Sequence, residues 1–211
     1  MRVIAGDARG HPLSAPPGRT TRPTSDRVRE ALFSSVAGEL PGAVVLDLFA
    51  GSGALGIEAL SRGAAYAVFV DHDRRAVGTV LRNLAAVRLR ARARVVQADA
   101  GRFSADPLSA LRVERGGGGP PGAFDLVLAD PPYALALPAV LGLLDDLAVA
   151  GALAGGTLAV VERERRDPHL ATVGEDLHDH SGGFAWLRNR VYGDTVLCYL
   201  RRSPAPAEEP Q

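Results

Sequence analysis

Three short stretches of the chain place an acidic residue beside residues that shape the backbone tightly. The first runs from Asp47 to Gly56 and carries glycines at 51, 53 and 56, in the spacing G-x-G-x-x-G. Glycines at this spacing let the backbone approach a ligand closely, and the amide groups of a following helix can point at it. The pattern predicts a nucleotide-type ligand site, but it does not name the ligand.

The second acid is Asp71, which ends the next apolar run, twenty residues after Gly51. A carboxylate at this place can accept hydrogen bonds from both hydroxyls of a ribose. An NAD-dependent oxidoreductase would show the same glycines and the same acid. Asp47 argues against that enzyme class, because a carboxylate at the glycine turn attracts an ammonium group and repels a pyrophosphate.

The third stretch, Asp130-Pro131-Pro132-Tyr133, directly follows an apolar run. Two consecutive prolines fix the backbone, so we expect the Pro131 carbonyl and the Asp130 carboxylate to face one point beside the Tyr133 ring. Two acceptors and a ring suit the exocyclic amine of a nucleobase. Taken alone, the tetrapeptide could also be an ordinary turn.

An α/β fold would place these residues at one edge of a sheet. Apolar runs alternate with helical patterns, which is typical of parallel strands joined by crossover helices. We expect strands at 43–48, 66–70, 93–97, 124–129 and 157–161, and helices at 53–62, 74–87, 105–113 and 138–150. Two apolar stretches within 184–201 flank a turn at residues 192–194 and predict a closing hairpin, hence at least one antiparallel strand at the sheet edge.

The N-terminal and C-terminal segments of the chain lie outside the alternating strand and helix pattern. Residues 2–14 predict a short β-hairpin, and the helix that follows should begin at Thr24 or Ser25. We therefore expect an N-terminal hairpin or arm at 1–22 that contacts RNA, one domain at 23–202 and a disordered tail at 203–211.

The charge composition of the chain limits how it can bind nucleic acid. The 211 residues carry 24 arginines, no lysine and 24 acids, so the net charge is zero. This excludes a uniformly basic nucleic-acid-coating protein. However, residues 1–30 hold six arginines against three acids, and residues 183–202 hold four against one, so local contacts with RNA remain possible.

The sequence also predicts the cellular compartment of the protein. A single cysteine, Cys198, excludes an intrachain disulfide, and this favours the cytoplasm. No apolar stretch approaches the roughly 20 residues that a membrane helix needs. We expect a cytoplasmic monomer without a metal and without a membrane span.

Together the motifs resemble a class I S-adenosylmethionine-dependent amino-methyltransferase. Three further stretches narrow the resemblance: Arg22-Pro23-Thr24 followed by 26–33, Glu58-Ala59-Leu60-Ser61-Arg62, and Tyr192-Gly193-Asp194-Thr195. With them the chain resembles the RsmD family, which methylates the N2 amine of guanine 966 in 16S rRNA. The resemblance runs to about residue 201; the insertion at 116–122, the acidic tail and the use of arginine for lysine depart from it without touching the motifs.

The resemblance implies a seven-stranded, mostly parallel sheet with one antiparallel strand and helices on both faces. It implies that Asp47 and the Gly51–Gly53 backbone hold the methionine part of the cofactor, Asp71 its ribose and Asp99 its adenine amine. The implied cofactor contacts are Thr24, Asp47, Phe49, Ala50, Gly51, Ser52, Gly53, Asp71, His72, Asp99, Ala100 and Asp130. Asp99 could instead cap a helix, and the two roles are compatible.

For the reaction, the resemblance implies that Asp130 and the Pro131 carbonyl bind the guanine amine, while Pro132 shapes the turn and Tyr133 stacks on the base. The product would be S-adenosylhomocysteine and the partner 16S rRNA, in the small subunit or an assembly intermediate. The expected RNA contacts are Arg9, Arg19, Arg22, Arg27 and Arg29, although Arg22, Arg27 and Arg29 could also form a solvated helix face.

Other activities remain open at this point. Adenine-N6 and protein-glutamine methyltransferases use a similar x-P-P-Y motif, and Asp rather than Asn at 130 argues against them. A non-catalytic RNA-binding relative that kept the fold is a further alternative.

Overall fold

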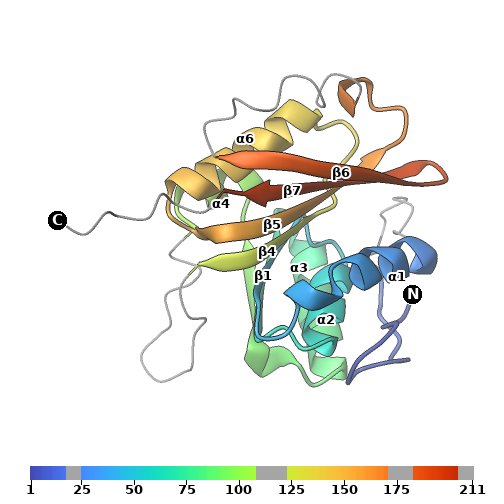
Figure 1. Cartoon of the computed structure of the whole chain (residues 1–211). Helices are drawn as coiled ribbons and strands as arrows, with labels where there is room; N and C mark the ends of the chain where they lie inside the picture. Colours follow the sequence, from blue (N-terminus) through green and yellow to red (C-terminus); the bar gives the residue numbers. More distant parts are fainter. Residues whose placement is uncertain (18–24, 108–122, 171–182, 204–211) are drawn as a thin grey trace.

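The structure is a computed structural model that describes residues 1–17, 25–107, 123–170 and 183–203. Its centre is a seven-stranded sheet in the order β3-β2-β1-β4-β5-β7-β6 (Figure 1). The strands are β1 (Val44–Leu48), β2 (Tyr66–Asp71), β3 (Ala93–Gln97), β4 (Phe124–Ala129), β5 (Leu153–Glu164), β6 (Phe184–Tyr192) and β7 (Thr195–Arg202). Strands β1 to β5 are parallel, and β7 runs antiparallel to both β5 and β6. The predicted sheet with one antiparallel strand is confirmed.

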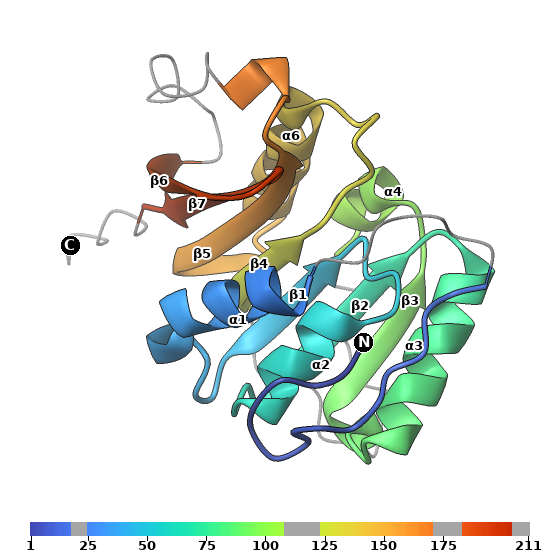
Figure 2. The ribbon, with the colours of Figure 1, turned by 90° about the vertical axis from the view of Figure 1, so that its right-hand side faces the viewer.

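Helices cover both faces of the sheet. They are α1 (Asp26–Ser35), α2 (Ala54–Ser61), α3 (Arg74–Ala86), α4 (Ala100–Ala105) and α6 (Leu137–Val149). Figure 2 shows α1, α2 and α3 on one side and α4 and α6 on the other. Two apolar clusters fill the layers, and all five residues of the central strand β1 are buried, as expected for a strand covered on both faces.

The predicted elements agree with the structure except at two places. A helix that was not predicted, α4, begins at Ala100, because the Asp99 side chain accepts a hydrogen bond from the Gly101 N–H (2.9 Å) and caps it there. Of the helix expected at 105–113, residues 108–113 lie outside the described part. The strand expected at 157–161 extends over 153–164, because it pairs with β7 as far as Glu164.

The N-terminal arm, residues 1–17, folds back on itself and docks on α2. One bridge pair forms, between Arg2 and Pro12, and the N–H groups of Val3, Gly10 and Leu13 donate to the carbonyls of His11, Val3 and Met1 at 2.9–3.0 Å. The two limbs therefore pair as a short hairpin, although without regular strands. The buried Glu58 carboxylate accepts hydrogen bonds from the backbone N–H groups of Ile4 (2.8 Å) and Ala5 (2.9 Å). The Ser61 carbonyl accepts from the Asp7 N–H at 2.8 Å. The arm is therefore fixed both by its contacts with α2 and by its own backbone pairing.

The predicted start of the first helix at Ser25 is confirmed. Ser25 caps α1 by accepting a hydrogen bond from the Val28 N–H at 3.2 Å. Cys198 packs in the core of β7, where burial raises the pKa of its thiol to about 12. Within the described residues, no helix combines the length and the apolar character that crossing a membrane requires.

Candidate active site

The loop from β1 to α2 turns sharply through three residues with positive φ. These are Phe49 (70°), Gly51 (56°) and Gly53 (78°). The Ala50 N–H donates to the Val70 carbonyl of β2 at 2.9 Å, so the loop is attached to the neighbouring strand. The loop brings backbone amides and the N-terminus of α2 to the carboxyl edge of the sheet, where a ligand of an α/β fold binds.

Gly56 is small because two groups need the space beside it. A Cβ at this position would lie 2.3 Å from Cε1 of Phe69 and 3.1 Å from Oδ2 of Asp47. The Gly56 N–H donates to the same Asp47 oxygen at 2.9 Å. The third glycine of the motif thus allows α2 to pack against β2 and to hold the Asp47 carboxylate.

Asp47 is the most deeply buried acid of the site, with 1% of its surface exposed. Burial raises its pKa well above the usual range, and the hydrogen bond from Gly56 opposes this rise. The charges of Asp130 and Asp71 raise the pKa further. The charges of Asp71 and Asp130, at the ends of the two strands that flank β1, therefore act on the Asp47 carboxyl.

Asp71 ends β2 and stabilises the glycine loop. Its Oδ2 accepts a hydrogen bond from the Gly51 N–H at 2.8 Å, and its Oδ1 accepts from the Asp73 N–H at 2.9 Å. The neighbouring His72 is exposed, with its Nδ1 at 3.6 Å from Asp71 Oδ1. The Asp71 carboxylate therefore fixes both the glycine loop and the backbone just before α3.

The sheet register brings the four predicted acids to one edge. Leu48 of β1 lies opposite Val70 of β2 and Ala129 of β4, and Asp71 lies opposite Gln97 of β3. Asp130 follows Ala129 directly, and Asp99 follows Gln97 by two residues. Asp99 is exposed and caps α4, with Ala100 buried at the first helical position.

The Asp-Pro-Pro-Tyr segment leaves β4 at this edge. Asp130 is half-buried, Pro131 is buried, and Pro132 and Tyr133 are exposed. The Tyr133 side chain is 53% exposed, an unusual position for a large ring. The segment then turns back toward α6 through a hydrogen bond from the Leu135 N–H to the Pro132 carbonyl at 2.9 Å.

Comparison with known proteins identifies the family. A family model described as "Conserved hypothetical protein 95" matches residues 1–201. The "Ribosomal RNA small subunit methyltransferase D" of Escherichia coli K12 is 40% identical over 165 residues, which cover 78% of this chain and 75% of that protein. The chain belongs to the RsmD family of methyltransferases. YlbH of Bacillus subtilis is also 40% identical over 204 residues, covering 96% of this chain and all of YlbH.

A solved structure supports the fold of this RsmD-family chain. That of yhhF from Escherichia coli has a TM-score of 0.73 and 34% identity, covering 97% of this chain and 99% of that one. The architecture is the class I methyltransferase fold, as the sequence predicted.

A pocket of about 290 Å³ adjoins the exposed Tyr133 of this methyltransferase. It lies between the segment after β4 and the end of β5, and its lining residues are Tyr133, Ala134, Ala136, Arg163, Glu164, Arg166, Asp167, Pro168 and His169. The β5 side of this pocket was not predicted from the sequence, because the expected strand ended at residue 161. Polar residues at the end of a strand carry no periodic signal that would have found them.

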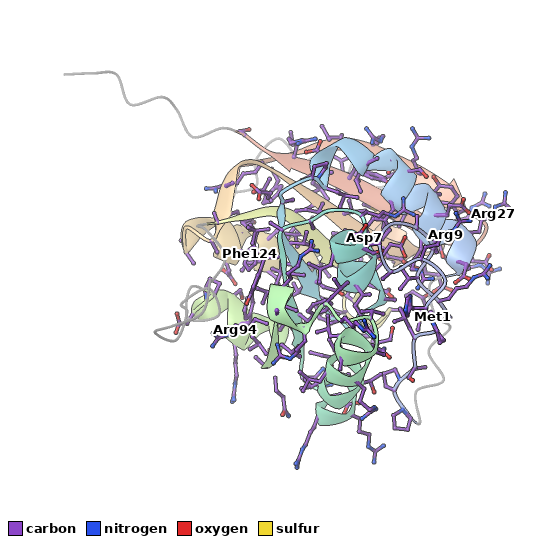
Figure 3. The ribbon with its side chains drawn as sticks, turned by 90° about the horizontal axis from the view of Figure 1, so that it is seen from below. Met1, Asp7, Arg9, Arg27, Arg94 and Phe124 are labelled. Carbon is purple, nitrogen blue, oxygen red and sulfur yellow. The ribbon has the colours of Figure 1, made fainter. Side chains whose placement is uncertain are left out.

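The arginines expected to bind RNA fall into three groups. Arg9 and Arg27 are exposed and lie on the same side of the molecule in Figure 3. Arg19 and Arg22 lie outside the described residues, as does Thr24. The prediction for Arg29 is wrong, because its side chain is 0% exposed.

Arg29 instead links α1 to the N-terminal arm. Its Nη2 donates to the Arg2 carbonyl at 2.6 Å and to Asp26 Oδ1 at 2.8 Å. Burial lowers the pKa of its guanidinium, and Asp26 and Glu58 oppose this. Across the part of the chain that the structure describes, no group of three or more His, Cys, Asp or Glu side chains could hold a metal ion.

Proposed function

We propose that this RsmD-family protein transfers a methyl group from S-adenosylmethionine to the exocyclic N2 of a guanine, position 966, in 16S rRNA. The observation that carries the proposal is the meeting of Asp47, Asp71 and Asp130 at one edge of the sheet. A ligand with sulfonium and ammonium groups would relieve their mutual repulsion, whereas the pyrophosphate of NAD would increase it. The residues present therefore fit S-adenosylmethionine.

In this proposal each part of the cofactor has a partner on the chain. Asp47 and the Gly51–Gly53 backbone hold the methionine part, and the Asp71 carboxylate binds the ribose. Asp99 accepts the adenine amine while it caps α4, since one carboxylate can do both. The exposed His72 borders the ribose side.

S-adenosylmethionine supplies an electrophilic methyl group on a sulfonium. The Asp130 carboxylate and the Pro131 carbonyl accept hydrogen bonds from the two N2 hydrogens of guanine. This makes the nitrogen more pyramidal and directs its lone pair at the methyl carbon. The Tyr133 ring stacks on the flipped base, so the chain acts by positioning and electrostatics, without a covalent intermediate.

The RNA partner follows from family and charge. The Escherichia coli relative is named as a small-subunit ribosomal RNA methyltransferase. Exposed Arg9 and Arg27 offer contacts to phosphates, which position a protein on RNA without reading its sequence. Because the net charge of the chain is zero, we expect general affinity for RNA to be weak and recognition to require the folded subunit.

The proposal is tested by incubating the protein with labelled S-adenosylmethionine and small subunits from a strain that lacks the endogenous enzyme. We expect label in N2-methylguanosine at one position. Label in N6-methyladenosine or in protein glutamine would reassign the substrate, and no transfer would leave a non-catalytic RNA-binding protein.

Two controls separate the roles of the site. Asp130→Ala should abolish transfer while leaving affinity for S-adenosylhomocysteine within about threefold, because the carboxylate contacts the base amine. Calorimetry with NAD and with S-adenosylhomocysteine addresses the oxidoreductase alternative, and tight binding of NAD alone would overturn the cofactor assignment.

A further inference from the structure

The pocket beside Tyr133 contains a cation whose hydrogen bonds are incomplete. Arg163, near the end of β5, is 2% exposed and lines the pocket. Its Nε and Nη2 both lie 2.6 Å from Asp167 Oδ2. Its Nη1 is buried and has no hydrogen-bond partner among the described residues. An unpaired buried donor of this kind is costly, and an acceptor bound beside it would offset that cost.

The backbone around Asp167 holds this arginine in place. The Asp167 N–H donates to the Glu164 carbonyl at 3.0 Å, and Asp167 Oδ1 accepts from the His169 N–H at 2.9 Å. The same carboxylate therefore fixes both the guanidinium and the turn that carries His169. A planar guanidinium fixed in this way keeps its remaining N–H groups in one direction.

The sheet register places Arg163 beside the proposed methylation site. Ala129 of β4 lies opposite Val161 of β5. Pro131 comes two residues after Ala129, and Arg163 comes two residues after Val161. The acceptors proposed for the base amine and the unpaired donor of Arg163 therefore lie at neighbouring strand ends. Arg163 and Tyr133 line the pocket, and Asp130 and Pro131 come three and two residues before Tyr133 on the chain.

We propose that this pocket holds the target guanine and that Arg163 selects it by donating a hydrogen bond to O6; the inference rests on the proposed function. Guanine presents donors at N2 and an acceptor at O6, which match the acceptors at Asp130 and Pro131 and the donor at Arg163. Adenine presents an amine in place of O6 and would oppose the Arg163 donor. The volume of about 290 Å³ is at the lower end of small-molecule pockets.

The charge of the pocket favours a base over a phosphate. Glu164 and Asp167 line it together with Arg163. Arg166 also lines the pocket, so two guanidinium groups balance two carboxylates and leave no net positive charge to attract a phosphate. A neutral base does not need such a charge.

The test uses reconstituted small subunits that carry either guanine or 2-aminopurine at the target position. 2-Aminopurine keeps the exocyclic 2-amine and lacks O6. The enzymes are the wild type, Arg163→Met and, as a matched control, Arg165→Met, which removes an exposed arginine of the same segment. The measured quantity is kcat/KM for methyl transfer on each particle.

We expect wild type and Arg165→Met to prefer guanine by about 10- to 100-fold, the range of one good base contact. Arg163→Met should lose this preference, because its rate on guanine falls while its rate on 2-aminopurine stays within about threefold. Equal loss on both substrates would overturn the inference and indicate a phosphate or structural role. An unchanged preference would also overturn it.

Folding is checked by thermal unfolding and by S-adenosylhomocysteine affinity. If Arg163→Met does not fold, Arg163→Lys keeps the ion pair with Asp167 but has no planar fork of donors. It should show the same loss of preference, and a retained preference would refute the role of Arg163. If the wild type methylates neither particle, the proposed function is wrong. The inference about Arg163 is then wrong as well, because it rests on that function.

Discussion

The carboxylate of Asp71 accepts a hydrogen bond from the backbone N–H of Gly51, across 2.8 Å. The two residues belong to different strand ends, since Asp71 closes β2 and Gly51 lies in the loop after β1. A single side chain thus fixes the loop that should hold the methionine part and also stands where the ribose should bind. Loss of this carboxylate should affect both functions together.

Asp71→Ala should weaken S-adenosylhomocysteine binding by about 10- to 100-fold. Hydrogen bonds to a charged group contribute about 1.5–3 kcal/mol each, and about 1.4 kcal/mol corresponds to a factor of ten. Isothermal calorimetry measures the affinity. Asp73→Ala is the control, because Asp73 caps α3 by accepting from the Arg75 N–H at 2.8 Å; it should lower stability by about 1 kcal/mol and leave affinity unchanged. Wild-type affinity in Asp71→Ala would contradict the assignment.

Asp47→Asn should stabilise the free protein increasingly as the pH rises. The pKa of Asp47 is raised in the folded state, chiefly by burial, so its protonated form favours folding. That contribution is complete below the pKa of the unfolded chain and is lost as the pH rises through the folded pKa. Asparagine stays neutral and keeps an acceptor for Gly56.

Thermal unfolding from pH 4 to pH 8 checks this expectation. The Tm difference between Asp47→Asn and wild type should be smallest at pH 4 and grow toward pH 8, with about 2–4 °C for each kcal/mol. The same substitution should weaken S-adenosylhomocysteine binding, because the ammonium group loses its counter-charge. A Tm difference that does not change with pH would show that Asp47 titrates normally.

The strands and the ligand loops could be predicted because their signals are local. Apolar runs marked the central parallel strands, and the glycine spacing marked the turn after β1. Asp99 was recognisable as a possible cap, but the short helix that it begins at Ala100 was not predicted. The end of β5 could not be predicted, because Glu162, Arg163 and Glu164 are polar and enter the sheet only through pairing with β7.

Arg29 shows why burial is harder to predict than secondary structure. An arginine in a helix that also carries Asp26 and Glu30 is typical of a solvated face. Its burial follows from the arm, whose Arg2 carbonyl accepts its hydrogen bond. A contact between residues 27 positions apart leaves no trace in local patterning, so the RNA-binding prediction failed there.

Asn83→Leu should release the arm from the glycine loop. The buried Asn83 side chain accepts from the Ser14 N–H at 2.9 Å and donates to the carbonyls of Ser14 (2.9 Å) and Ser52 (2.8 Å). Leucine would leave these three backbone groups without their partner, at about 1–3 kcal/mol for each group that stays buried. Hydrogen exchange should therefore speed up at Ser14 and in the glycine loop.

Arg82→Leu serves as the control for that experiment. Arg82 is exposed on the same helix and donates only to Thr79 Oγ1 among the side-chain bonds found for it. Its exchange pattern should match the wild type. If Asn83→Leu also matched the wild type, the arm would be held by α2 alone.

Gly6→Ala and Gly10→Ala form a matched pair that isolates the docking of the arm on α2. Both glycines have a φ of +83°. The backbone strain of an alanine at either position should therefore lower the free energy of unfolding by the same amount, about 1–2 kcal/mol. A Cβ at Gly6 would lie 1.8 Å from the Ser61 carbonyl oxygen, whereas a Cβ at Gly10 has no atom within 4 Å. Besides this strain, Gly6→Ala should therefore also break the hydrogen bond from the Asp7 N–H to the Ser61 carbonyl.

Chemical denaturation and limited proteolysis measure the two effects. Gly10→Ala should lower the free energy of unfolding by the strain alone and keep the arm protected. Gly6→Ala should lower it further and expose residues 1–17 to cleavage. Because Arg9 lies between these glycines on the exposed side of the arm, Gly6→Ala should also weaken binding to small subunits more than Gly10→Ala does. Equal stability and equal protection in the two variants would show that the arm does not need its close approach to Ser61.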